Sequence, residues 1–351
     1  PNGQLYDDVR VDQSLTGTLR IGAVSNKPGD NLLGTGSLYA FGRINNVVIS
    51  GDFAGGIVSY SGGINTVTIN NGSLLKRGVI QAFDGDINIV TVNSGHIFGE
   101  IHADYILYLV QINASADGVF GDLGINSALS QGVSTNDPLR NQLPPGVVPD
   151  GTIQGPRITA GFNIGRIILT NGSIFEAFIH AGRAIGTISV NGDIRNDNLT
   201  TGTGTVIAAG SSIFQVLATG NMSDVIVIAG ARSFGADGRP GGVGANADTI
   251  QSGRIETVSA TGAGTNVIIT AGMNAGNDGV YNTGDETVIL GVSYVRNALF
   301  AGGVSNASVF ADSPTLNVSP GVVTAGANFP LADPDLSDGS PILGGQITPG
   351  V

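Results

Sequence analysis

The hexapeptide INNVVI at residues 44–49 decides the fold, because close variants of it follow along the chain at intervals of about 20 residues. The first successors are INTVTI (64–69), INIVTV (87–92) and LYLVQI (107–112). Later copies are IGRIIL (164–169), IGTISV (185–190), IFQVLA (213–218) and IETVSA (255–260), and a weaker ninth copy begins at Val292. The aliphatic residues stand at the first, fourth and sixth positions, which predicts a short strand with one buried face.

Each copy continues in the same way through a turn, an apolar anchor and a second short strand. The turns read SGD (50–52), NNG (70–72), NSG (93–95), TNG (170–172) and NGD (191–193), and Gly and Asn suit sharp corners. The anchors are Phe53, Leu74, Ile97, Ile174, Ile194 and Met222. The closing element reads aliphatic-x-small: IVS (57–59), IQA (80–82), IHA (101–103), IHA (179–181), IAA (207–209), VIA (227–229), ITA (269–271) and VFA (309–311).

A repeat of this length predicts an all-β fold, a right-handed parallel β-helix (solenoid) of about nine to eleven coils with loop insertions. One coil cannot bury its own aliphatic row, but stacked coils form a continuous apolar column. Each fully buried aliphatic side chain then contributes about 1.5–3 kcal/mol. A β-sandwich or propeller is the alternative, and it requires antiparallel hairpins.

Interruptions of the repeat define the expected domain organisation. Residues 1–14 form an N-terminal extension or cap, 15–312 the solenoid domain, and 313–351 a Pro/Gly/Asp-rich C-terminal tail or cap. Insertions fall near 125–160, 231–253 and 273–287. In a solenoid, insertions leave the corners as loops, where binding function often resides. The tails are expected to cap this molecule or to pair with a neighbour's end, because an open sheet edge must be covered.

Composition excludes several classes of function. The chain has 56 glycines, 12% charged and 41% hydrophobic residues, which argues against disorder. It has no cysteine, and therefore no disulfide and no thiolate metal site. A net charge of −12 makes nucleic acid an unsuitable partner, since phosphate binding requires clustered basic residues. No apolar run is long enough for a membrane span. Because the chain starts at Pro1, we expect a processed or excised product.

The best candidates for catalysis are Glu100, His102 and Asp104, with His96 nearby. Glycoside-cleaving solenoids use carboxylates gathered on one face, which is why this cluster is considered. His180 occupies the same repeat position as His102, but an intervening coil should keep the two histidines apart. The interpretation adopted is that these are solvated side chains, that the chain has no catalytic residue and that it is not an enzyme.

Calcium is the one cofactor that the sequence suggests. The candidate ligands are Asp333, Asp335 and Asp338, although no calcium-loop motif is present. Asp84 and Asp86 flank a glycine at a corner. Seven Asn-x-Ser/Thr sequons are candidates for glycosylation: Asn71, Asn113, Asn171, Asn198, Asn221, Asn306 and Asn317. At least two of them lie on the repeat's own corner, so turn chemistry explains them as well.

The stretches GRINNVVISGDFAGGIVSYSGG (42–63) and RAIGTISVNGDI (183–194) resemble the Gly-rich solenoid repeats of large bacterial cell-surface proteins. This resemblance implies an extracellular, cell-surface scaffold and transfers no functional residue. We therefore expect a structural protein that self-associates into a homo-oligomer, filament, surface layer or matrix.

The alternative is a carbohydrate-binding adhesin or a tailspike-like module that acts on polysaccharides, with glycans as partners. The nearest approach to an aromatic patch is Tyr105, Tyr108 and Phe120, and the absence of Trp counts against sugar stacking.

Overall fold

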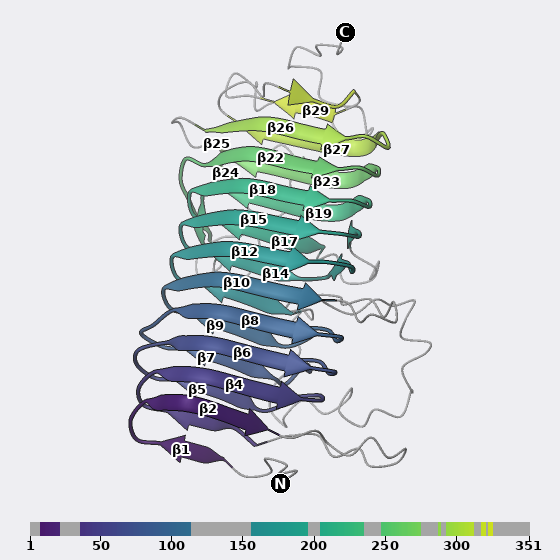
Figure 1. The fold of residues 1–351 in the computed structure, drawn as a ribbon. Helices are drawn as coiled ribbons and strands as arrows, with labels where there is room; N and C mark the ends of the chain where they lie inside the picture. Colours follow the sequence, from purple (N-terminus) through teal and green to yellow (C-terminus); the bar gives the residue numbers. More distant parts are fainter. Residues whose placement is uncertain are drawn as a thin grey trace.

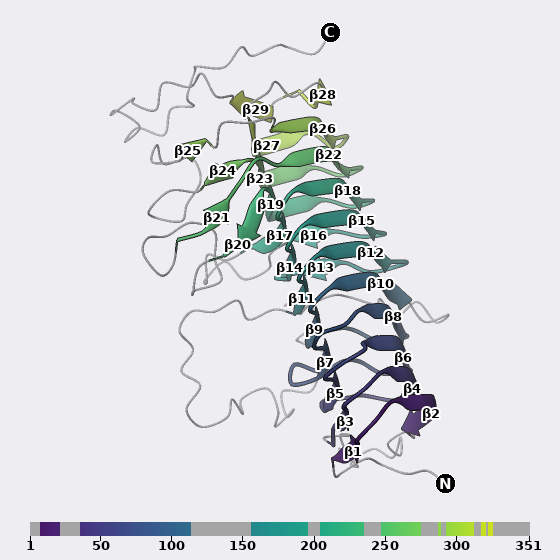
Figure 2. The same ribbon diagram turned by 90° about the vertical axis from the view of Figure 1, so that its left-hand side faces the viewer.

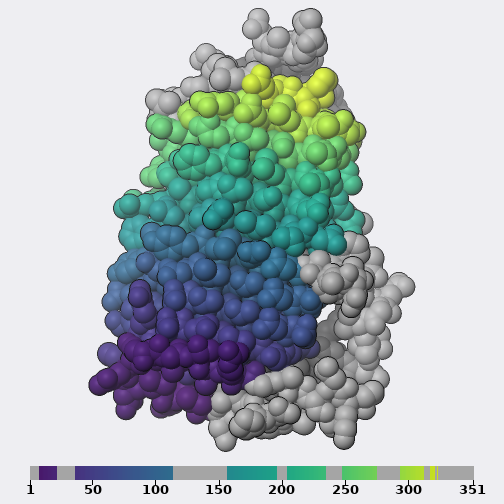
Figure 3. All heavy atoms as spheres, viewed as in Figure 1, coloured from purple at the N-terminus to yellow at the C-terminus, as the bar shows by residue number. Residues whose placement is uncertain are grey.

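The computed structural model describes residues 8–21, 36–113, 156–195, 204–234, 247–274, 287–288, 293–311, 317–320 and 322–325. These residues form strands and turns and contain no helix. Two long sheets run the length of the body, from β1 at one end to β29 at the other (Figure 1). The space-filling view in Figure 3 shows the sequence colours changing progressively along the long axis, so each layer is built from one stretch of chain.

The first sheet, called sheet B here, contains eleven strands. Its strands, in spatial order, are β2 (Leu15–Ile21), β4 (Ile44–Ser50), β6 (Ile64–Asn70), β8 (Ile87–Asn93), β10 (Ile106–Asn113), β12 (Asn163–Leu169), β15 (Ala184–Val190), β18 (Ser212–Ala218), β22 (Arg254–Ala260), β26 (Tyr294–Phe300) and β28 (Asn317–Val318). Every neighbouring pair is parallel, and Ile44 of β4 aligns with Ile64 of β6. The hexapeptide repeat is therefore the strand repeat of sheet B.

The second sheet, called sheet A, contains fourteen strands. Its main path is β1 (Val9–Val11), β3 (Leu38–Ala40), β5 (Gly56–Ser59), β7 (Val79–Ala82), β9 (Glu100–Ala103), β11 (Arg157–Ala160), β14 (Phe178–Ala181), β17 (Thr205–Ala209), β19 (Met222–Ala229), β23 (Gly264–Ala271), β27 (Val304–Ala311) and β29 (Val322–Ala325). Two short strands, β13 (Ile174–Phe175) and β16 (Ile194–Arg195), lie beside this path. Every strand pair in sheet A is parallel, whereas a β-sandwich or a propeller would require antiparallel pairs.

The chain alternates between the two sheets, so successive turns stack in the manner of a β-solenoid. The predicted columns face a common interior: Ile44, Val47 and Ile49 are at most 1% exposed, as are their counterparts in β6 and β8. The anchors form a third column, in which Phe53 pairs with Leu74 and Leu74 with Ile97. From β19 onward the anchor position joins the second strand, so that Met222, Gly264 and Val304 pair within longer strands.

Close stacking explains the glycines at the corners. A Cβ added to Gly95 would lie 1.8 Å from the carbonyl oxygen of Gly72 in the coil beneath, a distance no side chain can occupy. Gly63 has a φ of 79°, a conformation that L-residues rarely adopt. The corners therefore require glycine both for conformation and for space.

The prediction that the ninth copy of the repeat begins at Val292 was wrong. Pairing aligns Val295, rather than Val292, with Ile255, so this copy starts three residues later. The physical reason is that the large side chain of Phe300 packs against Gly264, which has no side chain. A Cβ added to Gly264 would lie 2.7 Å from the Phe300 ring. The later register is the one that places Phe300 in the core, where it is 2% exposed.

The sheets extend into both terminal segments. Strand β1 lies within residues 1–14 and pairs with β3, while β28 and β29 lie within residues 313–351 and continue the two sheets. Two insertions begin and end as antiparallel ladders, β20 (Ala231–Ser233) with β21 (Thr249–Ile250) and β24 (Met273–Asn274) with β25 (Thr287–Val288). Figure 2 shows both ladders on one side of the body.

Candidate functional site

Of the three catalytic candidates on and just after β9, His102 and Asp104 form a hydrogen-bonded pair, and Glu100 stands apart from them. His102 Nε2 lies 2.9 Å from Asp104 Oδ1, and His102 Nδ1 lies 2.7 Å from the hydroxyl of Thr159 on β11. Glu100 lies two residues before His102 on the same strand and forms no hydrogen bond or ion pair with it. Both members of the pair are partly exposed, at 28% and 39%. The hydrogen bonds fix the orientation of the His102 ring, but Glu100 and Asp104 are not placed on either side of a common point, as glycoside cleavage would require.

The other two histidines lie apart from this pair. Thr159 occupies the ladder position between His102 and His180, as the repeat predicted. The ring of His96 is stacked on that of Phe98, with centroids 5.3 Å apart. His180 is largely enclosed: its Nε2 lies 3.1 Å from the carbonyl oxygen of Ala231, and burial lowers its pKa.

Asp84 and Asp86 accept hydrogen bonds from the next coil and so stabilise the corner that contains them. Asp84 accepts a 2.5 Å hydrogen bond from the Tyr105 hydroxyl, which raises the pKa of that tyrosine. Asp86 accepts from the backbone N–H of Ile106 at 2.9 Å. Within the described ranges, no three acidic or histidine side chains are grouped so that they could hold a metal ion. The calcium candidates Asp333, Asp335 and Asp338 lie outside the described residues.

Three of the six described sequon asparagines belong to amide ladders between coils. The side-chain amide of Asn113 donates to Asn93 Oδ1 at 2.9 Å, that of Asn306 to Asn266 at 2.8 Å and that of Asn317 to Asn297 at 2.9 Å. Asn221 contacts Asp193 through its side-chain amide and its backbone N–H. A glycan on any of these nitrogens would displace a hydrogen bond that links adjacent coils.

Two other sequons stand at corners, and one is outside the described part. Asn71 has a φ of 52° at an exposed turn, which shows that turn geometry favours asparagine there. Asn171 is partly buried at the equivalent corner of a later coil. Asn198 lies outside the described residues.

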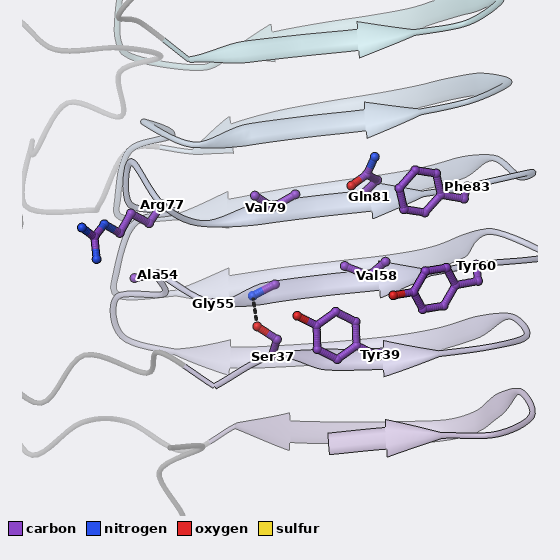
Figure 4. A pocket seen from close by; sticks show the side chains of 11 residues that line it. Ser37, Tyr39, Ala54, Gly55, Val58, Tyr60, Arg77, Val79, Gln81 and Phe83 are labelled. Atoms are coloured by element: carbon purple, nitrogen blue, oxygen red, sulfur yellow. Dashed lines mark hydrogen bonds between the residues drawn. The ribbon is translucent and has the colours of Figure 1, made fainter. Parts of the chain in front are cut away.

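An aromatic groove on the outer face of sheet A was not predicted. Three rings from successive coils follow one another: Tyr39 and Tyr60 have centroids 6.4 Å apart and planes 18° apart, and Tyr60 and Phe83 have centroids 5.8 Å apart and planes 6° apart. Tyr60 is 47% exposed and Phe83 is 37% exposed. Figure 4 shows the three rings side by side along the stack, each seen nearly face on.

Polar side chains complete this groove, whose volume is about 410 Å³. Arg77 stands at one end and Gln81 lies beside Phe83 (Figure 4). Ser37 accepts a 2.9 Å hydrogen bond from the backbone N–H of Gly56, which holds the groove floor in place. We refer to Tyr39, Tyr60, Phe83, Arg77 and Gln81 together as the aromatic groove.

The sequence contains a signal for two of these three rings. Tyr60 and Phe83 immediately follow the small residues that close two of the aliphatic-x-small triplets, Ser59 and Ala82. Phe41 follows Ala40 in the same way and is 66% exposed.

The aromatic residues predicted to approach a patch, Tyr105, Tyr108 and Phe120, do not contribute to this groove among the described residues. Tyr105 lies at the corner after β9, with its ring 5.5 Å from that of Phe162. Tyr108 lies within β10 of sheet B, and Phe120 is outside the described residues.

Comparison with known proteins adds no identification: no protein-family model, no curated protein and no solved structure matches this chain. Among the described residues, no helix has the length and hydropathy needed to cross a bilayer.

Proposed function

We propose that this chain is a non-enzymatic structural protein of the cell exterior, a right-handed parallel β-helix that self-associates end to end. The observation that carries the proposal is the pair of parallel sheets that continue along the whole described body over one apolar column. A column without a break resists bending, which suits a spacer, filament or surface layer. The right hand is supported by the strong general preference of parallel crossover connections.

The ends of the sheets support self-association. Within the described part of the chain, β1 pairs only with β3, and β29 pairs only with β27. The terminal strands of sheet B, β2 and β28, likewise have one neighbour each. A parallel strand edge is a template for another strand, so the first coil of one copy can continue the last coil of another. Such head-to-tail contacts generate open filaments rather than closed dimers.

The backbone of Arg10, on the unpaired edge of β1, is the group through which self-association can be tested. Val9 donates its backbone N–H to Ser37, and the carbonyl oxygen of Val11 accepts from Phe41. Residues on alternate positions of a strand direct their backbone groups to opposite sides, so the N–H and C=O of Arg10 face away from β3. Arg10 is therefore the residue whose backbone would pair with an incoming copy.

Replacement of Arg10 by proline tests this assembly. Proline removes the free donor without disturbing the ladder to β3, and we expect Arg10→Pro to suppress filaments seen by negative-stain electron microscopy and large species in sedimentation velocity. Arg10→Ala is the matched control and should assemble like the native chain. Dispersed monomers of the native chain at high concentration would contradict the proposal.

A further inference from the structure

We propose that Tyr39 and Tyr60 form a site of oxidative modification, at which a haem peroxidase and hydrogen peroxide join the two rings by a carbon–carbon bond. The bond would staple two adjacent coils to each other. The modification does not depend on end-to-end assembly, because both rings belong to one chain.

Tyrosine is the side chain of this molecule that an oxidant in solution meets first. The chain has no cysteine and no tryptophan. Its two methionines, Met222 and Met273, are only 0% and 7% exposed, which protects their sulfur atoms. By contrast, Tyr60 is 47% exposed and Tyr39 is partly exposed. Covalent links between coils therefore depend on tyrosines, since disulfides cannot form.

The solenoid holds the two rings next to each other, edge towards edge. Tyr39 lies in β3 and Tyr60 directly follows β5, the next strand of sheet A, so the rings belong to successive coils. Their centroids are 6.4 Å apart and their planes differ by 18°. Figure 4 shows the rings side by side, with the hydroxyl end of Tyr60 directed towards Tyr39. Two groups held in this way react within one molecule, which is faster than an encounter between separate chains.

The step is a two-electron oxidation of the pair. Each phenol gives up the hydrogen atom of its O–H bond, as an electron and a proton, and becomes a phenoxyl radical. The two radicals then pair at ring carbons next to the C–O carbons (Cε), which forms the new carbon–carbon bond. Each joined carbon loses its hydrogen as a proton, and each phenol oxygen regains one. Hydrogen peroxide accepts the two hydrogen atoms through the peroxidase, its O–O bond breaks and two water molecules leave.

The positions of the other tyrosines make this reaction selective. Within the described ranges, Tyr39 and Tyr60 are the one pair of tyrosines whose rings are neighbours. The ring beside Tyr105 is that of Phe162, which has no hydroxyl and forms no phenoxyl radical. Tyr108 lies on the outer face of the other sheet. We therefore expect the link within a chain to form between the two coils that contain Tyr39 and Tyr60.

Treatment of the dilute native chain with a haem peroxidase and hydrogen peroxide, followed by peptide mass spectrometry, tests the proposal. Trypsin cleaves after Arg43 and so releases Tyr39 and Tyr60 on different peptides. We expect these peptides to be recovered joined, at the sum of their masses less the two hydrogen atoms lost. The yield should not change on further dilution. Tyr60→Phe keeps the ring and its packing but removes the phenol, and it should abolish the link.

Phe83→Tyr is the matched variant that should gain a link, because the rings of Tyr60 and Phe83 have centroids 5.8 Å apart and planes 6° apart. It should give joined peptides from position 83 and Tyr60, whereas Tyr108, which is also 47% exposed, should stay unlinked within the chain. Absence of joined peptides from the native chain, or the same link in Tyr60→Phe, would overturn the proposal. A yield that falls on dilution would also overturn it, because the tyrosines would then couple between copies.

Discussion

The outer face of sheet A is open in its first half and covered in its second, although both halves are built by the same repeat. One ladder column shows the contrast. In the open half it reads Tyr39, Val58, Gln81, His102 and Thr159, all partly exposed except Val58. In the covered half it reads His180, Ala208, Ile228, Thr270 and Phe310, all buried except His180. The covered half packs into a second apolar cluster that includes residues of the β20–β21 and β24–β25 ladders.

This difference teaches that the two faces of a strand are under separate control. The inward positions are aliphatic along the whole stack, because every coil must bury them against its neighbours. The outward positions vary with what lies over them: Ile228 and Phe178 are 0% and 2% exposed beneath the insertions, whereas Gln81 and His102 remain partly exposed. The β20–β21 and β24–β25 ladders therefore convert one half of the face into a core, while the described outward residues of the other half stay mostly partly exposed.

The largest expected effect comes from making the covered column resemble the open one. Ile228→Gln places a polar amide in the second apolar cluster, where it loses apolar contacts and finds no water. We expect a loss of about 3 kcal/mol in the free energy of unfolding, measured by urea denaturation with circular dichroism. The reciprocal Gln81→Ile, on the open face, should change stability by less than about 0.5 kcal/mol. Equal effects of the two substitutions would show that the halves do not differ in this way.

A smaller effect is expected from pH, through His180 in the covered half. Burial lowers the pKa of His180 below its usual 6.5, with Arg157 acting in the same direction and the hydrogen bond to Ala231 opposing them. The unfolded chain therefore takes up the proton more readily than the folded one. The stability that neutral His180 provides is fully present above pH 6.5 and is lost as pH falls below that value.

The measurement is the urea midpoint at pH 7.5 and 5.5, for the native chain and for His180→Gln. The native chain should lose more stability on acidification than the variant, because glutamine does not titrate in this range. An identical loss in both proteins would mean that His180 does not contribute to the pH dependence.

The smallest effect is expected at the equivalent histidine of the open half. His102 is partly exposed and its partners, Asp104 and Thr159, are reached from the surface. We expect His102→Gln to cost less than about 1 kcal/mol in the same denaturation assay, since an exposed hydrogen-bonded pair contributes little. A loss as large as that of Ile228→Gln would indicate that the open face is not open at this coil.

The inner columns could be predicted from the sequence, whereas the site could not. Ile44, Val47 and Ile49 were assigned correctly because the strand period is local and their neighbours repeat it. The ninth copy failed because Val292 and Val295 have the same three-residue spacing as Ile44 and Val47. The sixth position separates the two registers: it is the polar Asn297 in a copy that starts at Val292 and the buried Phe300 in the copy that starts at Val295.

The aromatic groove was missed for a related reason. Each of its rings lies on a different coil, and the rings meet only after the coils stack in register. Tyr105 and Tyr108 are close in sequence, yet the structure assigns them to a corner and to the opposite sheet. Proximity along the chain is a poor guide to proximity on the surface of a solenoid, where neighbours are one whole coil apart.

The sequence by itself determined the repeating unit, the corners and the aliphatic interior, because each depends on a few adjacent residues whose pattern recurs. The tertiary structure alone decided the aromatic groove and the division of sheet A into a covered and an open half. The physical reason is that burial of an outward side chain depends on segments that pack over it from other coils. A local pattern contains no record of those segments.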